Sequence, residues 1–208
     1  MKTRAFVLLL MALFVSGAAY AIPYGFYNIT NNNIADAGIG EAQLSVDITD
    51  AGNNQVLFTF LNSGPYASSI CDVYFQDGPL LGIASITNAT GVSFSQYASP
   101  GNLPGGNAVN FVTTEGFSAD SDAPAQPNGV NPGESLGITF SLINESSFED
   151  VLASINAGEL RIGIHVQGFA SGASESYVNT APVPEPATML LLGTGLLGLA
   201  GFRKKMQK

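Results

Sequence analysis

The chain of 208 residues carries 16 acidic and 7 basic residues, which gives a formal net charge of −9. This acidity argues against nucleic acid and anionic lipid headgroups as partners, because like charges repel one another. The single cysteine excludes an internal disulfide, and one cysteine with one histidine is too few for a Cys/His zinc cluster.

The first 21 residues have the layout of a secretory signal peptide. Lys2 and Arg4 give a positive start, and the apolar run over residues 5–15 is too short to cross a bilayer comfortably. Ala19 and Ala21 place small residues where a signal peptidase requires them. We therefore expect export by the Sec route, with cleavage after Ala21. An uncleaved anchor is the alternative.

Residues 22–182 are expected to form one all-β domain of the β-sandwich or jelly-roll type. Short runs that are apolar, or that alternate between apolar and polar residues, predict strands, and clusters of Gly, Pro, Asn and Asp separate them. The expected strands cover residues 43–49, 55–61, 70–75, 80–86, 92–96, 109–113, 135–143 and 159–169. Residues 97–106 and 118–133 are predicted to be long loops.

One short α-helix is expected before the last strand, where it would close one end of the sandwich. Ser146 and Glu149 have the spacing of a capping box, and Gly158 is a suitable stop. Apolar residues follow at helical spacing: Phe148, Val151, Leu152 and Ile155.

The last predicted strand carries the most unusual polar face of the domain. Arg161 is the only Lys or Arg within residues 22–182, against fifteen acidic residues. Arg161, His165 and Gln167 alternate with apolar residues and therefore share one face of the strand. This face is a candidate site for an anionic or hydroxylated sugar. In the alternative interpretation, Arg161 pairs with a carboxylate and His165 is simply solvated.

Two segments rich in Asp are candidate calcium sites. Asp47 and Asp50 lie near a predicted turn, and Asp120 and Asp122 lie in the second predicted loop. Calcium prefers roughly six to eight oxygen ligands. Neither segment matches the EF-hand loop, and such side chains also cap turns. Calcium is the only cofactor considered.

No catalytic residue is predicted. A catalytic triad would depend on His165 as the single available base, and no serine lies in a G-x-S-x-G motif. Cys71 lies inside a predicted strand, where we expect a buried and unreactive thiol. These observations favour a binding or structural role over an enzymatic one.

Residues 183–208 have the three-part layout of a sorting and anchoring signal. A short motif precedes an apolar span over residues 187–202, which predicts a transmembrane helix, and a basic cluster follows and predicts a cytoplasmic C-terminus. The motif and the cluster consist of Val183, Pro184, Glu185, Pro186, Arg203, Lys204 and Lys205. A tail anchor without processing is the alternative.

This layout resembles the PEP-CTERM sorting domain. The resemblance implies that an exosortase-type transpeptidase recognises Pro184-Glu185-Pro186 and cleaves an intermediate anchored in the inner membrane. It also implies a Gram-negative envelope, a cell-surface or extracellular-matrix location, and an association with exopolysaccharide or biofilm. Residues 130–134 and 163–169 are also similar to small β-rich PEP-CTERM ectodomains. We therefore expect an exported, non-catalytic surface or matrix protein, with a secreted hydrolase of extracellular polysaccharide as the alternative.

Overall fold

The computed structural model describes residues 21–180. The tail motif, the predicted transmembrane helix and all of the predicted signal peptide except Ala21 lie outside the described residues. Within the described part of the chain, no helix is long and apolar enough to cross a membrane.

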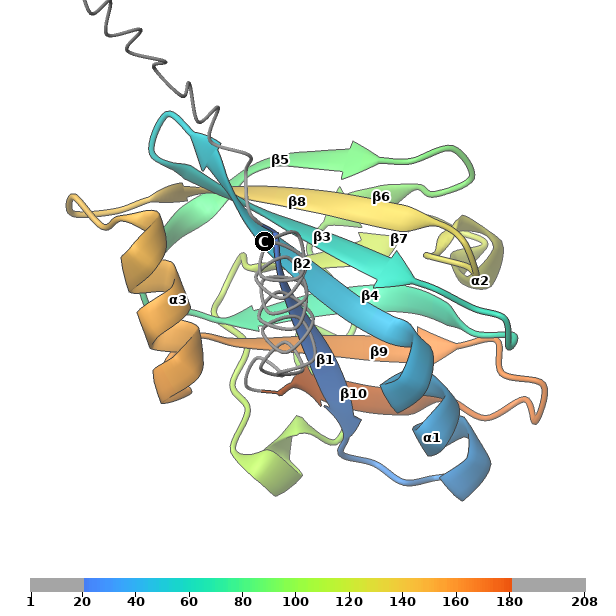
Figure 1. Ribbon diagram of the computed structural model, residues 1–208. Helices are drawn as coiled ribbons and strands as arrows, with labels where there is room; N and C mark the ends of the chain where they lie inside the picture. Colours follow the sequence, from blue (N-terminus) through green and yellow to red (C-terminus); the bar gives the residue numbers. More distant parts are fainter. Residues whose placement is uncertain (1–20, 181–208) are drawn as a thin grey trace, which may run out of the picture.

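Ten antiparallel strands form one sheet that folds over on itself (Figure 1). In spatial order, the strands are β5-β8-β3-β2-β1-β10-β9-β4-β7-β6. Their bounds are β1 Ile22–Asn28, β2 Leu44–Gly52, β3 Gln55–Asn62, β4 Ser69–Gln76, β5 Leu80–Asn88, β6 Phe94–Gln96, β7 Ser118–Ser121, β8 Ser135–Leu142, β9 Arg161–Gln167 and β10 Glu175–Asn179. The predicted β-rich fold is confirmed.

Strand β1 joins the two halves of the sheet. Residues 22–25 pair with β2, whereas residues 26–28 pair with β10. The two halves then pack face to face, so that Phe58 of β3 and Phe140 of β8 meet Phe75 of β4 with ring centroids 5.2 and 4.6 Å apart. All three rings are fully buried. The alternating pattern of β3 and β8 thus supplies one wall of the core.

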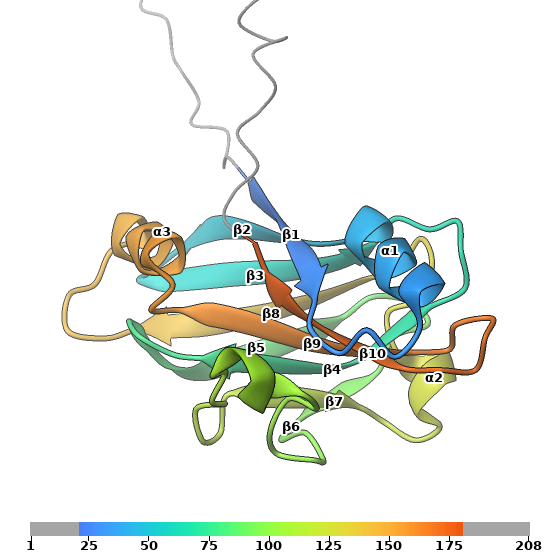
Figure 2. The ribbon, with the colours of Figure 1, turned by 90° about the horizontal axis from the view of Figure 1, so that it is seen from below.

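Helices cover the ends of the folded sheet. The described helices are α1 (Ile34–Gln43), α2 (Ala125–Asn128) and α3 (Phe148–Ala157), and a 3₁₀ turn covers Gly106–Val109. Figure 2 shows α1 and α3 at opposite ends of the strands. The predicted helix corresponds to α3, and Gly158 ends it in a left-handed conformation as expected. Helices α1 and α2 were not predicted.

The capping box of α3 lies one residue beyond the predicted pair. Ser147, not Ser146, is the N-cap, and Asp150, not Glu149, is the third helical residue that completes the box. The backbone of Ser146 instead closes a turn by donating to the Ile143 carbonyl at 2.7 Å. This start directs Val151 and Ile155 into the core.

Two other segment predictions are wrong. Residues 109–113 were predicted to be a strand, but the 3₁₀ turn ends there and Val112 is 65% exposed. Residues 118–133 were predicted to be a loop, but they contain β7 and α2. Strand β7 exists because it pairs with β4 and β6, a long-range interaction that overrides its weak local strand propensity.

A buried carboxylate fixes the segment between β1 and α1. Glu175 of β10 has no exposed surface. It accepts hydrogen bonds from Asn28 Nδ2 at 3.0 Å, Thr30 Oγ1 at 2.5 Å and the backbone N–H groups of Asn32 and Asn33 at 3.1 and 2.5 Å. Burial raises the pKa of Glu175, but these hydrogen bonds outweigh that effect and leave the pKa lowered. The carboxylate is therefore charged and fully satisfied.

Candidate functional site

A β-bulge in β4 turns two consecutive side chains toward the outer face of the sheet. Ile70 pairs with Val166 and Asp72 pairs with His165, so Cys71 is the extra residue on β4. Ile70 belongs to the core, as does Val73. Cys71 and Asp72 between them both line a hollow on the opposite side. Because of the bulge, the Asp72 side chain lines the hollow together with Cys71, whereas strict alternation would direct only one of these two side chains to this face.

The acidic hollow, as we call it, is a cavity of about 330 Å³ over β9, β4 and β7. The polar residues of its wall include Asp72, Ser99, Asp120, Ser121, His165 and Gln167. Asp72 is the middle residue of one row across three strands, because it pairs with His165 on β9 and with Asp120 on β7. Side chains that lie directly opposite on neighbouring strands approach closely. The fold therefore brings together residues that are far apart in sequence.

The two carboxyl groups of the acidic hollow share a proton. Asp72 is only 4% exposed. Burial raises the pKa of Asp72 to about 8, with further contributions from the hydrogen bond with Asp120 and from the repulsion of its charge. At neutral pH, Asp72 consequently favours its protonated form and can donate a hydrogen bond.

Two other polar groups of the hollow have unused hydrogen-bonding capacity. Ser121 is 5% exposed, and its buried hydroxyl has no hydrogen-bond partner. The Nδ1 atom of His165 lies 3.1 Å from Ser176 Oγ, which leaves the other ring nitrogen available. Burial lowers the pKa of His165, and attraction to Glu175 opposes this only in part. His165 is therefore a neutral donor or acceptor at neutral pH.

The thiol of Cys71 adds no reactivity to this wall. The residue is buried, as expected, and has no disulfide partner. Burial raises the pKa of Cys71 to about 11. Since the thiolate is the nucleophilic form, this cysteine is unreactive at neutral pH.

Arg161 lies away from the acidic hollow. Its Nη1 atom donates to the carbonyl oxygens of Val109 and Asn110 at 3.1 and 3.2 Å and to Gln76 Oε1 at 3.4 Å. Its guanidinium carbon lies 5.4 Å from the centre of the Phe111 ring. Of the predicted ligand face, the structure brings His165 and Gln167 together in the hollow, whereas Arg161 anchors the segment that follows the 3₁₀ turn. These partners include no carboxylate.

The predicted calcium residues are dispersed. Asp47 and Asp50 are separated by an odd number of positions on β2, so their side chains leave opposite faces of the strand. Asp122 accepts hydrogen bonds from the hydroxyls of Ser93 and Ser95 at 2.6 and 2.8 Å, and Asp120 faces Asp72. Among residues 21–180, no group of three or more His, Cys, Asp and Glu side chains is arranged to hold a metal ion.

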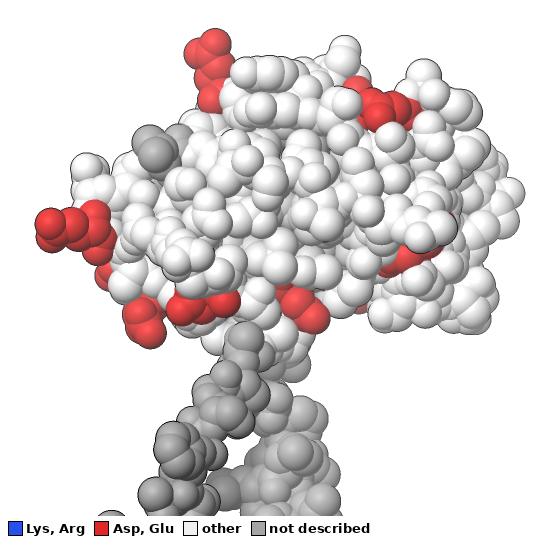
Figure 3. All heavy atoms as spheres, turned by 90° about the horizontal axis from the view of Figure 1, so that it is seen from above, with Lys and Arg blue, Asp and Glu red and all other residues white. Residues whose placement is uncertain are grey.

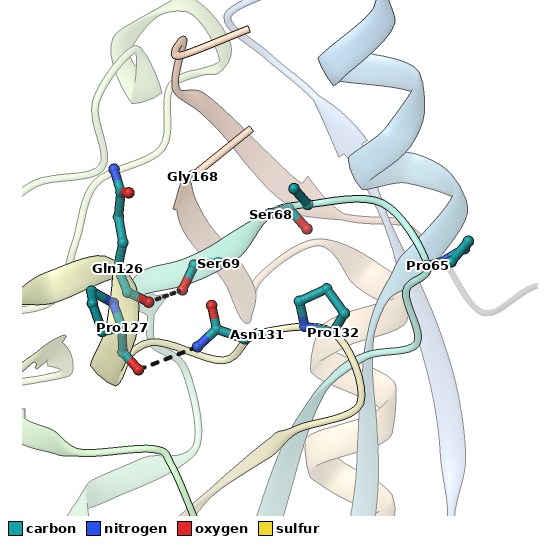
Figure 4. A pocket seen from close by; sticks show the side chains of 9 residues that line it. Pro65, Ser68, Ser69, Gln126, Pro127, Asn131, Pro132 and Gly168 are labelled. Carbon is teal, nitrogen blue, oxygen red and sulfur yellow. Dashed lines mark hydrogen bonds between the residues drawn. The ribbon is translucent and has the colours of Figure 1, made fainter. Parts of the chain in front are cut away.

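A second hollow lies beside α2 (Figure 4). This proline-lined hollow has a volume of about 470 Å³, and its wall includes Pro65, Pro127 and Pro132. Ser69 Oγ donates to the Gln126 carbonyl at 2.9 Å, which fixes α2 to the start of β4. Residues that are neighbours in sequence line the two hollows. Ala125 of α2 and Gln167 of β9 line the acidic hollow, whereas Gln126 of α2 and Gly168, which follows β9, line the proline-lined hollow. The two hollows are therefore adjacent.

The domain exposes acidic side chains on the face drawn in Figure 3. Figure 3 shows Asp and Glu side chains spread over one face of the domain, with no Lys or Arg among the described residues visible there. Within residues 21–180, Arg161 is the only Lys or Arg, and it is engaged by carbonyl groups. The acidic pair consequently has no basic residue to neutralise it.

Comparison with known protein families finds one match, to the PEP-CTERM protein-sorting motif, at residues 182–205. The chain carries a PEP-CTERM sorting signal. The predicted resemblance is thus confirmed, and the signal implies an exported protein with a C-terminal anchor that exosortase processes. No curated protein matches the chain. The sorting signal lies outside the folded domain, so the activity of that domain must be inferred from its own structure.

The sequence alone did not reveal Asp72 or Ser121 as site residues of this PEP-CTERM protein. Asp72 lies in the apolar run of β4, where a single acid is easily attributed to a strand edge. The available signal was the adjacent pair Cys71-Asp72, which interrupts the alternation expected of a half-buried strand and is compatible with a bulge. Ser121 could not be recognised because β7 was assigned to a loop.

Proposed function

We propose that this PEP-CTERM protein is a non-catalytic protein of the cell surface or extracellular matrix of a Gram-negative bacterium, and that it binds extracellular polysaccharide. Export begins with signal peptidase cleavage after Ala21 and ends with exosortase cleavage near Pro184-Glu185-Pro186. The sorting signal supports export and processing. The acidic hollow supports sugar binding, because it combines hydrogen-bond donors and acceptors in one cavity.

The observation that carries the binding proposal is the position of Asp72 and Asp120 opposite each other on β4 and β7, where both line one cavity. Each sugar hydroxyl both donates and accepts a hydrogen bond, so a neutral carboxyl beside a carboxylate offers it both functions. Gln167 and the free nitrogen of His165 extend this wall. The adjacent proline-lined hollow gives a polymer room to continue beyond one sugar unit.

Binding is tested with polysaccharide isolated from the host. The full-length protein in detergent micelles should co-sediment with the polymer, and Gln167→Ala should weaken this association. Glu159→Gln is the matched control, since Glu159 is exposed and its side chain forms no hydrogen bond with the described residues. Equal co-sedimentation of Gln167→Ala and wild type would exclude the acidic hollow as the binding site.

Processing is tested by the intact mass of the native protein. A mass that starts at Ile22 and ends near Pro184 to Pro186, in extracellular or outer-surface fractions, is the expected result. A mass that extends to Lys208 in the membrane fraction would instead identify a simple tail-anchored protein.

The second candidate function is hydrolysis of extracellular polysaccharide. It is favoured by the paired carboxyl groups, because one protonated and one charged carboxyl group are the acid and the base that glycosidases use. Release of reducing ends from the host polymer, abolished by Asp120→Asn, would establish this activity and exclude the non-catalytic proposal. We expect no release.

A further inference from the structure

Among the residues that the structure describes, no Lys or Arg lines the acidic hollow beside its two carboxyl groups. The ionisable groups around Asp72 are Cys71 and Tyr74 on its own strand, Asp120 on β7 and His165 on β9. Neither the cysteine nor the tyrosine can supply positive charge, and burial disfavours the charged form of His165. Arg161, the only Lys or Arg among the described residues, is bonded to the carbonyls of Val109 and Asn110. Within residues 21–180, no side chain therefore supplies a compensating positive charge to the hollow.

The groups in the hollow are acceptors in need of donors. Asp72, Asp120 and Ser121 all line one cavity. The Ser121 hydroxyl is buried and has no partner within residues 21–180, which is costly unless a ligand supplies one. An alkylammonium group donates three hydrogen bonds and carries one positive charge. Its three donors match two carboxyl groups and a hydroxyl, and its positive charge can take the place of the proton that the carboxyl groups share.

A divalent metal ion fits the hollow less well. Calcium takes roughly six to eight oxygen ligands, and only two carboxyl groups are present here. No arrangement suitable for a metal is found among the described residues. The hollow thus favours a singly charged donor.

We propose that the acidic hollow binds the ammonium group of an amino sugar between Asp72 and Asp120. This proposal rests on the proposed polysaccharide-binding function and names the class of sugar unit that the site selects. On binding, the incoming ammonium ion takes the place of the proton that the two carboxyl groups share, and that proton passes to the solvent. Both carboxylates are then charged and paired with the ligand. N-acetylation removes the charge of the amino group and therefore prevents this exchange.

The test is calorimetric titration of the full-length protein in detergent micelles at pH 6.5. The probes are a glucosamine tetramer and an N-acetylglucosamine tetramer, which differ in charge but share the sugar ring. Repeating each titration in two buffers of different ionisation enthalpy gives the number of protons released. We expect the glucosamine tetramer to bind about tenfold more tightly or better, with release of about one proton per sugar chain bound.

Three variants complete the test. Asp72→Asn and Asp120→Asn should each reduce affinity for the glucosamine tetramer about tenfold or more and abolish proton release, because each removes one carboxylate. Glu159→Gln should behave as wild type. Circular dichroism verifies that each variant is folded. Equal affinity for the two tetramers, or binding without proton release, would overturn the proposal.

The results separate this proposal from the broader one. If the host polysaccharide binds but neither tetramer discriminates, the amine site is wrong and the polysaccharide function stands. If the glucosamine tetramer binds with proton release but the host polysaccharide does not bind, the amine site stands and the polysaccharide function fails.

Discussion

Replacing Asp72 by Asn should stabilise the domain, although it removes a buried side chain from its own site. Asp72 has a raised pKa in the folded state, about 8 against an ordinary value of 3.8. Between these two values the folded protein holds a proton that the unfolded chain releases. Folding is therefore opposed increasingly as pH rises through this interval. An amide cannot ionise, so Asp72→Asn removes the opposition while keeping a donor beside Asp120.

The magnitude follows from the interval between the two pKa values. Each pH unit corresponds to about 1.4 kcal/mol, so the interval from 3.8 to 7 gives an upper limit of about 4 kcal/mol at pH 7. The difference between variant and wild type should be largest near pH 8 and should vanish near pH 4. The direction is opposite to that of a carboxylate in an ion pair, which stabilises a protein at neutral pH and loses this effect in acid.

The assay is urea unfolding of residues 22–182, followed by circular dichroism because the chain has no Trp. Comparing variant and wild type at each pH from 4.5 to 8.5 cancels the contributions of other ionisable groups. Glu159→Gln, an exposed carboxylate, should show no such trend. If Asp72→Asn is less stable than wild type at pH 8, or if the difference does not change with pH, the raised pKa does not control stability as argued here.

Three other substitutions test the packing around the site. Glu175→Gln should lower the free energy of unfolding by about 2–3 kcal/mol at pH 7, since it weakens the hydrogen bonds that the charged carboxylate accepts. The pKa of Glu175 is lowered on folding, so this stabilising effect is present above the ordinary pKa of 4.5 and is lost as pH falls below it. The urea-unfolding curves of variant and wild type should therefore converge near pH 3. Gly163→Ala should lower the free energy of unfolding by about 1–3 kcal/mol, because the added carbon would lie 2.7 Å from Leu103 Cδ2. Gly38→Ala, in open space on α1, should be neutral or stabilising. Thermal unfolding distinguishes the two variants, and an equal loss of stability in both would contradict the packing argument. Arg161→Met should lower the free energy of unfolding in urea by about 1–2 kcal/mol, because it removes the cation–π and carbonyl contacts, and it should leave polysaccharide binding intact. Lost binding with unchanged stability would instead show that Arg161 belongs to the ligand site.

The elements that the sequence predicts well are those with strong local patterns. Strands β2 and β3 form a hairpin close to the predicted residues 43–49 and 55–61, because alternating residues and the intervening turn both specify it. Helix α3 was found from its apolar spacing and its glycine stop, with an error of one residue at its start. In both cases the information lies within a dozen residues.

The elements that were missed depend on distant partners. Helix α1 has weak amphipathic patterning and contains two glycines, one of which, Gly40, allows Tyr177 of β10 to approach closely. Strand β7 has four residues and is defined by its pairing with β4 and β6. The candidate site has the same origin, because Asp72, Asp120 and His165 meet only after β9, β4 and β7 are in register. A single sequence does not contain that register.

Two of the buried carboxyl groups of the domain, those of Glu175 and Asp72, are accommodated in different ways, and the difference supports the proposed ligand site. Glu175 is surrounded by donors from the segment after β1, so its pKa is lowered and nothing further is required of it. Asp72 has a second acid as its neighbour, so its pKa is raised and its charge is suppressed by a proton. Glu175 shows that hydroxyl and backbone donors can satisfy a buried carboxylate in a domain with one Arg and no Lys. Such donors could have satisfied Asp72 in the same way. Because Asp72 lacks these donors and the nearby Ser121 hydroxyl also has no partner, the acidic hollow is the place where an external cation gains most by binding.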